Sequence, residues 1–265
     1  MSSKGLGELA RTLQSYHRPG NPIVLANVHD VFSAKAVAPL SSAKALATAS
    51  YAVAIAAGTS DDDLTLEQNV AAARLIGKVA AEHNKPLTVD LQDGYGDRIT
   101  EAVRQVIEAG AVGINLEDYN KETKMFYSVD EAAARVKTAV EVGAKEGMPD
   151  FVVNARCDTL VQGGGMEETI ERGRKYLAAG ATSVFVWGGS KRGISRAEVQ
   201  RLVKEFDGRL NVSLKWADGL TVSELAELGV SRISVGPTIA FLAMAEYERQ
   251  AQHLLEQAHG QKRSE

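Results

Sequence analysis

The chain has 265 residues, of which 45% are hydrophobic and 24% are charged, with a formal net charge of −4. This length is enough for one large domain with a substantial core. Charges of both signs are interspersed, so no basic patch indicates a nucleic-acid partner and no polybasic cluster indicates membrane binding. No apolar run approaches the roughly 20 residues of a membrane span.

Cysteine content and the amino-terminal segment bear on the cellular compartment. Cys157 is the only cysteine, so the chain cannot form an internal disulfide, as is usual in a reducing compartment. Residues 1–20 lack the apolar core of a signal peptide. We therefore expect a cytoplasmic protein.

Short β-branched runs alternate with longer helical stretches along the whole chain. We predict an N-terminal helix before Pro19 that covers a barrel floor, and eight strands at 23–27, 51–56, 87–90, 112–116, 151–155, 183–187, 210–214 and 232–235. Helices are predicted at 33–48, 64–83, 98–109, 129–146, 166–179, 195–206, 221–228 and 237–257. Several helices are followed by a glycine that ends them before the next strand: Gly110, Gly180 and Gly229.

Eight strands, each followed by a helix and with no break in composition, predict a (β/α)₈ TIM barrel. We expect residues 1–265 to form a single barrel domain with a short N-terminal helix and a C-terminal helical tail. A doubly wound parallel sheet is the competing fold, because the number of strands alone does not exclude it.

Active sites of such barrels lie at the carboxyl ends of the strands. Acidic residues gather there after the predicted second, third and fourth strands: Asp61, Asp62, Asp63, Asp90, Glu117 and Asp118. Their mutual repulsion would be costly without a cation, and carboxylates with water are the oxygen ligands that Mg²⁺ prefers. Arg156, after the fifth strand, adds a fixed cation. Metal and arginine together predict a site for a small carboxylate substrate.

Each of these features also has a purely structural interpretation. Asp62 and Asp63 could cap the following helix, and Asp90 and Glu117 could form structural ion pairs with Arg156. The glycines at 163–165 lack the Lys-Ser/Thr of a phosphate loop and indicate a mobile loop instead. His29 is expected to be a packed or surface residue, and Cys157 has no obvious histidine base. Lys215, at a strand end, could be a Schiff-base lysine.

Six segments together resemble the isocitrate lyase/phosphoenolpyruvate mutase superfamily over nearly the whole chain. They are Asn27-Val28-His29-Asp30 with Ser33-Ala34, Gly58 with Asp61, Asp90 leading into Gly94-Tyr95-Gly96, residues 113–118 (GINLED), residues 154–158 (NARCD) and residues 229–237 (GVSRISVGP). The GYG, ED and NAR-x-D elements at this separation are specific as a set, although each alone would be weak.

The resemblance implies a barrel whose last helix is swapped between the subunits of a homodimer or homotetramer. It implies Mg²⁺, with Mn²⁺ as a possible substitute, and a small 2-oxo or 2-hydroxy acid as substrate. By position, Asp90 would ligate the metal directly, Asp61 and Glu117 would hold it through waters, and Gln92 would contribute its amide oxygen. Substrate would be bound by Arg156, by Asn154 and by the backbone at Ser50 and Tyr51.

The sequence departs from the superfamily pattern in two places. Gln92 replaces an aspartate that commonly stands two residues after the first, which removes one negative charge from the metal site. The loop 119–125 (YNKETKM) lacks the lysine-cysteine-glycine-histidine signature of the isocitrate and methylisocitrate lyases. It also lacks the lysine-threonine-asparagine-serine pattern of the phosphonopyruvate enzymes. Tyr95, Lys121 and Lys124 are therefore the candidates for the acid or base, with Tyr95 the best placed.

These observations lead to one main hypothesis and two alternatives. The main hypothesis is a Mg²⁺-dependent lyase that cleaves a C–C bond, or less favourably a P–C bond, with Arg156, Tyr95 and Glu117 as catalytic residues. The alternatives are a metal-free Schiff-base aldolase that uses Lys215 and a barrel that binds an oxo-acid without turning it over. Loop 118–128, Trp187 and Trp216 should set the pocket size. The apolar segment 239–245 fits either a subunit contact or a core face.

Overall fold

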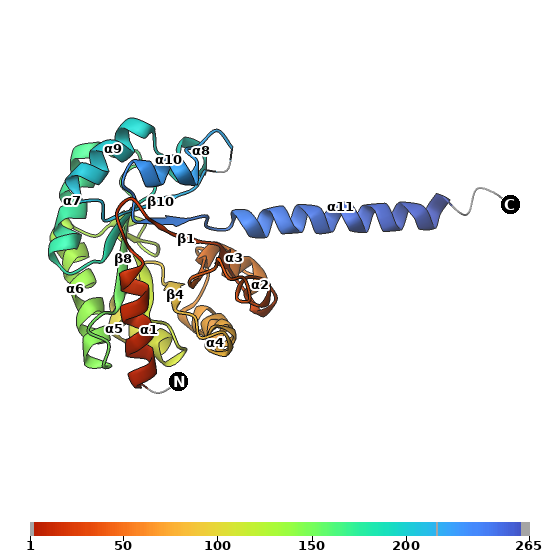
Figure 1. The fold of residues 1–265 in the computed structure, drawn as a ribbon, viewed down its shortest axis with the longest axis horizontal. Helices are drawn as coiled ribbons and strands as arrows, with labels where there is room; N and C mark the ends of the chain where they lie inside the picture. Colours follow the sequence, from red (N-terminus) through yellow and green to blue (C-terminus); the bar gives the residue numbers. More distant parts are fainter. Residues whose placement is uncertain (1–2, 216, 261–265) are drawn as a thin grey trace.

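The computed structural model describes residues 3–215 and 217–260, and it shows a closed barrel of parallel strands surrounded by helices (Figure 1). The first strand of the barrel is interrupted at Ala26. Its first half, β1 (Ile23–Leu25), pairs with β11, and its second half, β2 (Asn27–Val28), pairs with β3. The two ends of the sheet are thus halves of one strand, so the sheet closes on itself, and the (β/α)₈ fold is confirmed over the doubly wound alternative.

The remaining strands of the barrel follow in chain order. They are β3 (Leu46–Thr48), β4 (Leu87–Asp90), β5 (Gly113–Glu117), β8 (Val152–Cys157), β9 (Ser183–Val186), β10 (Leu210–Ser213) and β11 (Arg232–Ser234). A small antiparallel hairpin, β6 (Tyr119–Asn120) and β7 (Met125–Phe126), follows β5. The strands carry β-branched and apolar residues buried on both faces, as a parallel sheet covered by helices requires.

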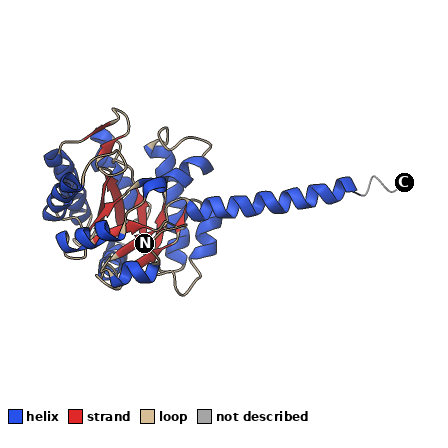
Figure 2. Cartoon of the chain, turned by 90° about the horizontal axis from the view of Figure 1, so that it is seen from above, coloured by secondary structure: helices blue, strands red, loops and turns tan. Residues whose placement is uncertain are grey.

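The helices surround the strands, as Figure 2 shows from above. They are α1 (Ser3–Ser15), α2 (Val31–Val37), α3 (Ser50–Ala56), α4 (Leu66–Glu82), α5 (Ile99–Glu108), α6 (Val129–Lys145), α7 (Met166–Ala178), α8 (Gly189–Arg192), α9 (Arg196–Glu205), α10 (Val222–Glu227) and α11 (Thr238–Gly260), with a 3₁₀ turn η1 (Gly96–Arg98). Among the described residues, no helix is both long and apolar enough to span a membrane.

The prediction for the second strand is wrong. Residues 51–56 form helix α3, and the strand is β3, inside the segment predicted as helix 33–48. The sequence Tyr-Ala-Val-Ala-Ile-Ala alternates like a strand, but Ser50, Val53 and Ala54 are buried while Ile55 is exposed. This spacing of i, i+3 and i+4 is that of a helix with one buried face, and alanine favours helix.

Helix α1 covers the amino ends of the strands, as predicted for the barrel floor. Its Leu9, Ala10 and Leu13 are buried, and Leu13 Cδ2 lies 3.2 Å from the place where a Cβ on Gly113, the first residue of β5, would stand. The same Cβ would come within 2.8 Å of the Cβ and backbone oxygen of Val152 on the neighbouring strand β8, so a side chain at position 113 would collide there and crowd the floor. This close approach explains why β5 begins with glycine.

Polar side chains fill part of the barrel interior below the mouth. The Nδ2 of Asn154 donates to Asn115 Oδ1 at 2.8 Å and to Asn211 Oδ1 at 3.1 Å, and Arg232 donates to the same Asn115 oxygen at 3.0 Å. Ser183 donates to Asn154 Oδ1 at 2.6 Å. Burial lowers the pKa of Arg232 to about 9. These bonds satisfy groups that would otherwise be costly to bury.

Helix α11 projects away from the barrel as a single long rod (Figures 1 and 2). Large apolar side chains lie exposed along it: Phe241, Leu242, Met244, Tyr247, Leu254 and Leu255. Within this protomer, the apolar segment at the start of α11 is therefore an exposed surface and not a core face.

Candidate active site

Asp90 ends strand β4 and is held by the neighbouring strand. Its backbone N–H donates to Thr48 Oγ1 at 2.8 Å, and its Oδ2 accepts from the backbone N–H of Ser50 at 2.9 Å. Its other oxygen, Oδ1, is buried without a hydrogen-bond partner among the described residues. A buried carboxylate oxygen without a partner is costly, and a bound cation would offset that cost.

Two further carboxylates share the electrostatic environment of Asp90. Burial raises the pKa of Asp61, and the negative charge of Asp90 raises it further, while a hydrogen bond with Ser50 opposes the shift. Burial raises the pKa of Glu117 well above its usual range; Arg156 opposes this, and the charges of Asp158, Asp90 and Asp61 add to it. The structure thus places Asp61, Asp90 and Glu117 in one electrostatic cluster, as predicted. Asp90 and Glu117 end strands, whereas Asp61 lies in the loop after helix α3 and not at a strand end.

Arg156 is fixed by two carboxylates at the end of β8. Its Nε and Nη2 donate to the two oxygens of Asp158 at 2.6 and 2.9 Å, and its Nη1 donates to Glu117 Oε1 at 2.6 Å. Its guanidinium carbon lies 4.2 Å from the centre of the Trp187 ring. Burial lowers the pKa of Arg156, but Asp158 and Glu117 more than offset this and raise it above the usual value. Three of the five N–H groups of a guanidinium are used, so two remain for a ligand.

Gln92 joins the acidic cluster to the hairpin after β5. Its Nε2 donates to the backbone oxygen of Asp61 at 2.7 Å and to Asp61 Oδ1 at 3.1 Å, and its Oε1 accepts from Lys121 Nζ at 2.6 Å. Lys121 also donates to the backbone oxygens of Leu64 at 2.9 Å and Asp61 at 3.2 Å. Both ends of the Gln92 amide thus have protein partners, and its role as a metal ligand stays a prediction.

Lys121 is held beside the acidic cluster by these hydrogen bonds to Gln92, Leu64 and Asp61. Burial lowers its pKa, while the carboxylates of Asp61, Asp93 and Glu117 oppose the shift. Its ammonium also lies 5.2 Å from the centre of the Tyr95 ring. The sequence indicates Lys121 only as a candidate acid or base, and no pattern in it predicts the contacts with Gln92 and the Asp61 loop.

Tyr95 lies in a glycine-rich turn that needs left-handed backbone. Tyr95 has φ 60° and Gly94 has φ 82°, where a Cβ would come within 3.1 Å of Ile99 Cγ1. The turn is held by Asp93, which accepts from the Tyr95 N–H at 3.1 Å and from the Tyr127 hydroxyl at 2.8 Å. The GYG motif therefore builds the turn that places Tyr95 beside the carboxylates.

The hydroxyl of Tyr95 is held by Asn69, a residue that the sequence analysis missed. Asn69 Nδ2 donates to Tyr95 Oη at 3.0 Å and to the backbone oxygen of Asp90 at 2.9 Å. Burial raises the pKa of Tyr95 above its usual value, although the Asn69 hydrogen bond opposes this. One feature of the sequence could have indicated Asn69: it is an asparagine inside an alanine-rich helix, where asparagine has a poor helix propensity.

Several candidate residues lie outside this cluster. Asp118 is buried and accepts from the Tyr176 hydroxyl at 2.6 Å and the Asp158 N–H at 2.9 Å, so its role is structural. Asp62 pairs with Lys124 at 2.6 Å on the surface. Asn154 is fully buried in the barrel interior, one layer below the mouth; its role in substrate binding stays a prediction.

Within residues 3–215 and 217–260, no group of three histidine, cysteine, aspartate or glutamate side chains is placed to hold a metal ion. An ion at the mouth would therefore need ligands other than three such side chains, such as water or substrate oxygens. Mg²⁺ commonly has such ligands, with one or two protein carboxylates.

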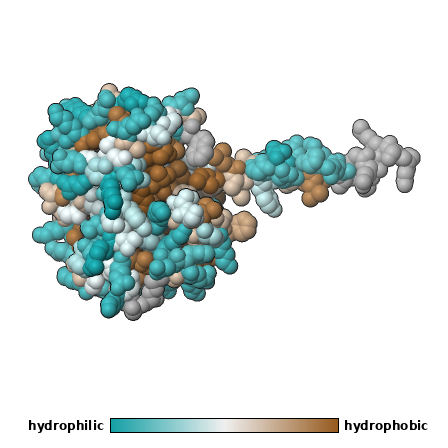
Figure 3. All heavy atoms as spheres, in the orientation of Figure 1, coloured by the Kyte–Doolittle hydropathy of each residue, from teal (hydrophilic) through white to brown (hydrophobic). Residues whose placement is uncertain are grey.

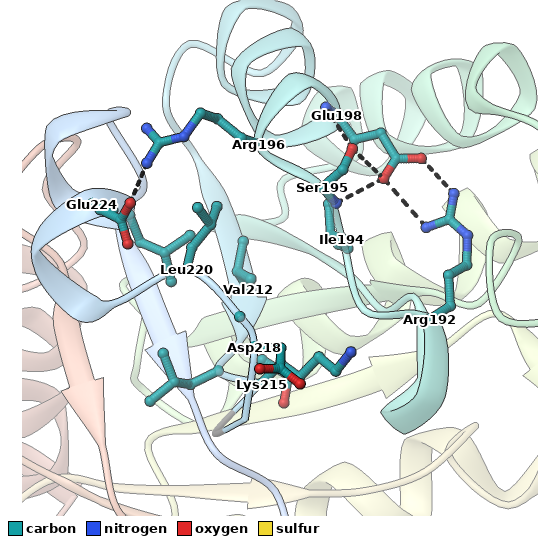
Figure 4. Close-up of a pocket in the computed structure, with 14 residues that line it drawn as sticks. Arg192, Ile194, Ser195, Arg196, Glu198, Val212, Lys215, Asp218, Leu220 and Glu224 are labelled. Atoms are coloured by element: carbon teal, nitrogen blue, oxygen red, sulfur yellow. Dashed lines mark hydrogen bonds and ion pairs between the residues drawn. The ribbon is translucent and has the colours of Figure 1, made fainter.

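Two cavities adjoin the strands on the side of the mouth away from the acids. One, of about 450 Å³, lies beyond Trp187 and reaches the first turn of α11. The other, of about 510 Å³, lies between α9 and α10 (Figure 4), where Arg196 pairs with Glu224 and Arg192 with Glu198. Lys215 lines both, and its Nζ donates to the Lys191 backbone oxygen at 3.2 Å. Trp216, predicted to set pocket size, lies outside the described residues.

Fold and site together define a (β/α)₈ barrel whose acids and one fixed arginine converge at the carboxyl ends of the strands. The family model of phosphoenolpyruvate phosphomutase matches residues 13–255. The chain belongs to this family, within the phosphoenolpyruvate mutase/isocitrate lyase superfamily.

The proteins that this chain resembles carry different names. An uncharacterized protein of Mycobacterium tuberculosis is 33% identical over 223 residues, which are 83% of this chain and 80% of that protein. A Burkholderia cenocepacia structure, named provisionally as a phosphonomutase, has a TM-score of 0.85 and 34% identity, with 94% and 99% of the two chains covered. A 2,3-dimethylmalate lyase structure has a TM-score of 0.81 and 25% identity, with 95% and 87% covered.

Two further superfamily structures contain ligands. An oxaloacetate acetylhydrolase with its product oxalate has a TM-score of 0.80 and 26% identity, with 95% and 87% of the two chains covered. A phosphonopyruvate hydrolase with oxalate and Mg²⁺ has a TM-score of 0.81 and 22% identity, with 94% and 87% covered. Both of these proteins thus bind oxalate, and the phosphonopyruvate hydrolase holds it together with Mg²⁺.

Proposed function

We propose that this protein is a Mg²⁺-dependent lyase that cleaves a C–C bond of a small 2-oxo or 2-hydroxy carboxylic acid through an enolate-like intermediate. A P–C bond is the less favoured target. The observation that carries the proposal is the buried, unpartnered Oδ1 of Asp90, which lies in one electrostatic cluster with Asp61, Glu117 and Arg156. The names of the relatives, which include lyases and hydrolases of such acids, support it.

The residues present fit a hard divalent cation. Asp90 would hold the metal directly through Oδ1, and Asp61 and Glu117 would hold its water ligands. Gln92 would position Asp61 through the two hydrogen bonds described above. When bound, Mg²⁺ would neutralise the cluster and polarise the oxygens of the substrate. Mn²⁺ takes the same oxygen ligands and would be expected to substitute.

Arg156 and the first turn of α3 would bind the substrate carboxylate. The two free N–H groups of Arg156 can donate to a carboxylate, and Asp158 and Glu117 keep its plane fixed. The N–H of Tyr51 lies in the first turn of α3, where no intrahelical acceptor exists. These donors are in place before the reaction, so they can stabilise negative charge as it develops.

Tyr95 would supply the proton that completes turnover. When the C–C bond breaks, its electron pair remains on the carbon next to the carboxylate, and that carbon must take up a proton. The raised pKa of Tyr95 keeps its hydroxyl protonated at neutral pH, and Asn69 holds the oxygen in place. Lys121, at the same side of the mouth, is the second candidate.

The long helix α11 would pack on a second copy of the chain. It projects from the barrel with exposed apolar side chains near its base and again towards its far end (Figure 3), and such a surface is unfavourable in water. A swap of this helix between subunits, in a homodimer or homotetramer, would bury it.

The test of the proposed activity is the consumption of candidate acids, beginning with oxaloacetate and 2-methylmalate-type acids. The expected result is turnover that requires Mg²⁺, stops with chelator and is lost in Asp90→Ala. The matched control is Asp63→Ala, at a solvated loop position where Asp63 bonds to Ser60. The Schiff-base alternative would be favoured instead if activity survived chelator and if borohydride, added with substrate, trapped a covalent adduct on Lys215. Ligand binding without turnover would favour a non-catalytic barrel.

A further inference from the structure

The mouth of the barrel has two chemically different halves. The acids and Arg156 follow β3, β4, β5 and β8, whereas the cavity of about 450 Å³ lies over the ends of β9, β10 and β11. The cavity walls include five apolar side chains that come from separate segments: Val186, Ile194, Leu214, Val235 and Phe241. A space-filling view shows apolar residues gathered in the hollow beside the base of α11 (Figure 3).

The cavity and the acidic cluster share a wall. Trp187 lines the cavity, and the same ring stacks on the guanidinium of Arg156 at 4.2 Å. Tyr51 also lines the cavity, and it directly follows Ser50, whose N–H holds Asp90. A ligand whose carboxylate lies on Arg156 would therefore lie close to the Trp187 ring that also lines the cavity.

Charged side chains are sparse on the cavity wall. Lys215 is the only charged residue among the described residues that line it, and its ammonium donates to the backbone oxygen of Lys191 at 3.2 Å. The volume lies within the range of complete small-ligand pockets, roughly 300–1,000 Å³. This cavity volume is larger than a single methyl group would fill.

From this arrangement we infer that the cavity receives an apolar alkyl or aryl chain of the substrate. The inference rests on the proposed function, because it places the acid end of that substrate on Arg156 and the Asp90 cluster. The substrate class is then a 2-oxo or 2-hydroxy acid with a hydrophobic chain several carbons long. A short dicarboxylic acid such as oxaloacetate would leave the cavity unfilled.

The experiment measures binding of a homologous series by titration calorimetry in the presence of Mg²⁺. The series is pyruvate, 2-oxobutanoate, 2-oxopentanoate and 2-oxohexanoate, with 2-oxoglutarate as a charged counterpart and oxalate as a ligand without a chain. Burial of one methylene is worth ~0.8 kcal/mol, which is about a fourfold fall in Kd. We expect this fall at each step of the series, and weaker binding of 2-oxoglutarate than of 2-oxohexanoate.

Three variants test whether the effect of chain length arises in the cavity. Ala217→Phe, at an exposed loop position on the cavity wall, should remove the dependence on chain length and leave oxalate binding unchanged. The matched control is Ala134→Phe, at an exposed position on α6, which should keep the full dependence. Lys215→Met should not weaken binding of 2-oxohexanoate.

The outcomes separate this inference from the proposed function. If oxalate binds with Mg²⁺ but chain length has no effect, the cavity does not bind the substrate chain, as when a second subunit fills it, and only this inference is overturned. If 2-oxoglutarate binds more tightly than 2-oxohexanoate and Lys215→Met removes that preference, the cavity selects a charge and the inference is also overturned. If oxalate itself does not bind, the proposed function fails first.

Discussion

Lys121 and Lys124 lie on the same short hairpin and make contacts of different strength, so they form a natural pair of variants. Lys121 Nζ makes three hydrogen bonds, to Gln92 Oε1 and to the backbone oxygens of Leu64 and Asp61, in a half-buried setting. Lys124 Nζ makes one ion pair with Asp62, and both side chains are more than half exposed. Lys121 should therefore hold the hairpin closed, and Lys124 should contribute little.

The magnitude follows from these contacts. Hydrogen bonds of a charged group are worth about 1.5–3 kcal/mol each when buried. The three bonds share one ammonium and are not additive, and about half of the group is exposed to solvent screening. Counting them as about one such bond, we expect Lys121→Met to lower the free energy of opening the hairpin by about 1–2 kcal/mol. That change corresponds to roughly 5–30-fold more opening. Lys124→Met removes an exposed pair worth about 0–1 kcal/mol, or less than about fivefold.

Amide hydrogen exchange over residues 119–126 measures this opening directly, because local exchange reports the free energy of local opening. In Lys121→Met these amides should exchange roughly 5–30 times faster, while amides of the barrel strands should not change. The reasoning would be refuted if Lys121→Met exchanged like the unmodified protein. It would also be refuted if Lys124→Met accelerated exchange as much as Lys121→Met.

Three further predictions concern catalysis, pH and assembly. Tyr95→Phe should lower kcat by about 10²–10⁴ with little change in KM, as measured by steady-state kinetics, because it removes a proton donor and keeps the ring. In the folded protein without metal, the pKa values of Asp61 and Glu117 are raised, so the folded state binds protons more tightly than the unfolded state. The free energy of unfolding should therefore fall as pH rises from the usual carboxyl range through the raised pKa values. Mg²⁺ competes with those protons, so the gain in Tm from Mg²⁺ should grow with pH in thermal scans; a gain independent of pH would count against the cluster. Leu254→Glu should shift the assembly toward monomer in sedimentation analysis, whereas Gln252→Glu on the same helix should not, and equal behaviour of the two would argue against a swapped α11.

Most of the barrel could be predicted because buried parallel strands leave a clear pattern. From β4 onward, each strand of the barrel has three to six residues and lies within two residues of its predicted limits. The second strand could not be found in this way. β3 has only three residues, and the alternating sequence of α3 imitates a strand until its burial shows a helical face.

The site residues at strand ends could be predicted from the sequence, whereas the contacts between loops could not. Asp90, Glu117 and Arg156 end strands of one barrel, so the topology alone brings them together. The bond between Gln92 and Lys121 joins positions 29 residues apart through two loops, and no periodicity predicts such a contact. Likewise, the sequence does not say at which depth of the barrel Asn154 lies.

Titration calorimetry of Mg²⁺ and oxalate with the unmodified protein and with Asp90→Asn is the most direct test of the metal-dependent site. Asparagine keeps the shape of Asp90 and removes the charge that would hold the ion. The proposed site predicts that oxalate binds only when Mg²⁺ is present, and that Asp90→Asn removes binding of both. Oxalate binding of equal strength without Mg²⁺, or unchanged Mg²⁺ binding in Asp90→Asn, would contradict it.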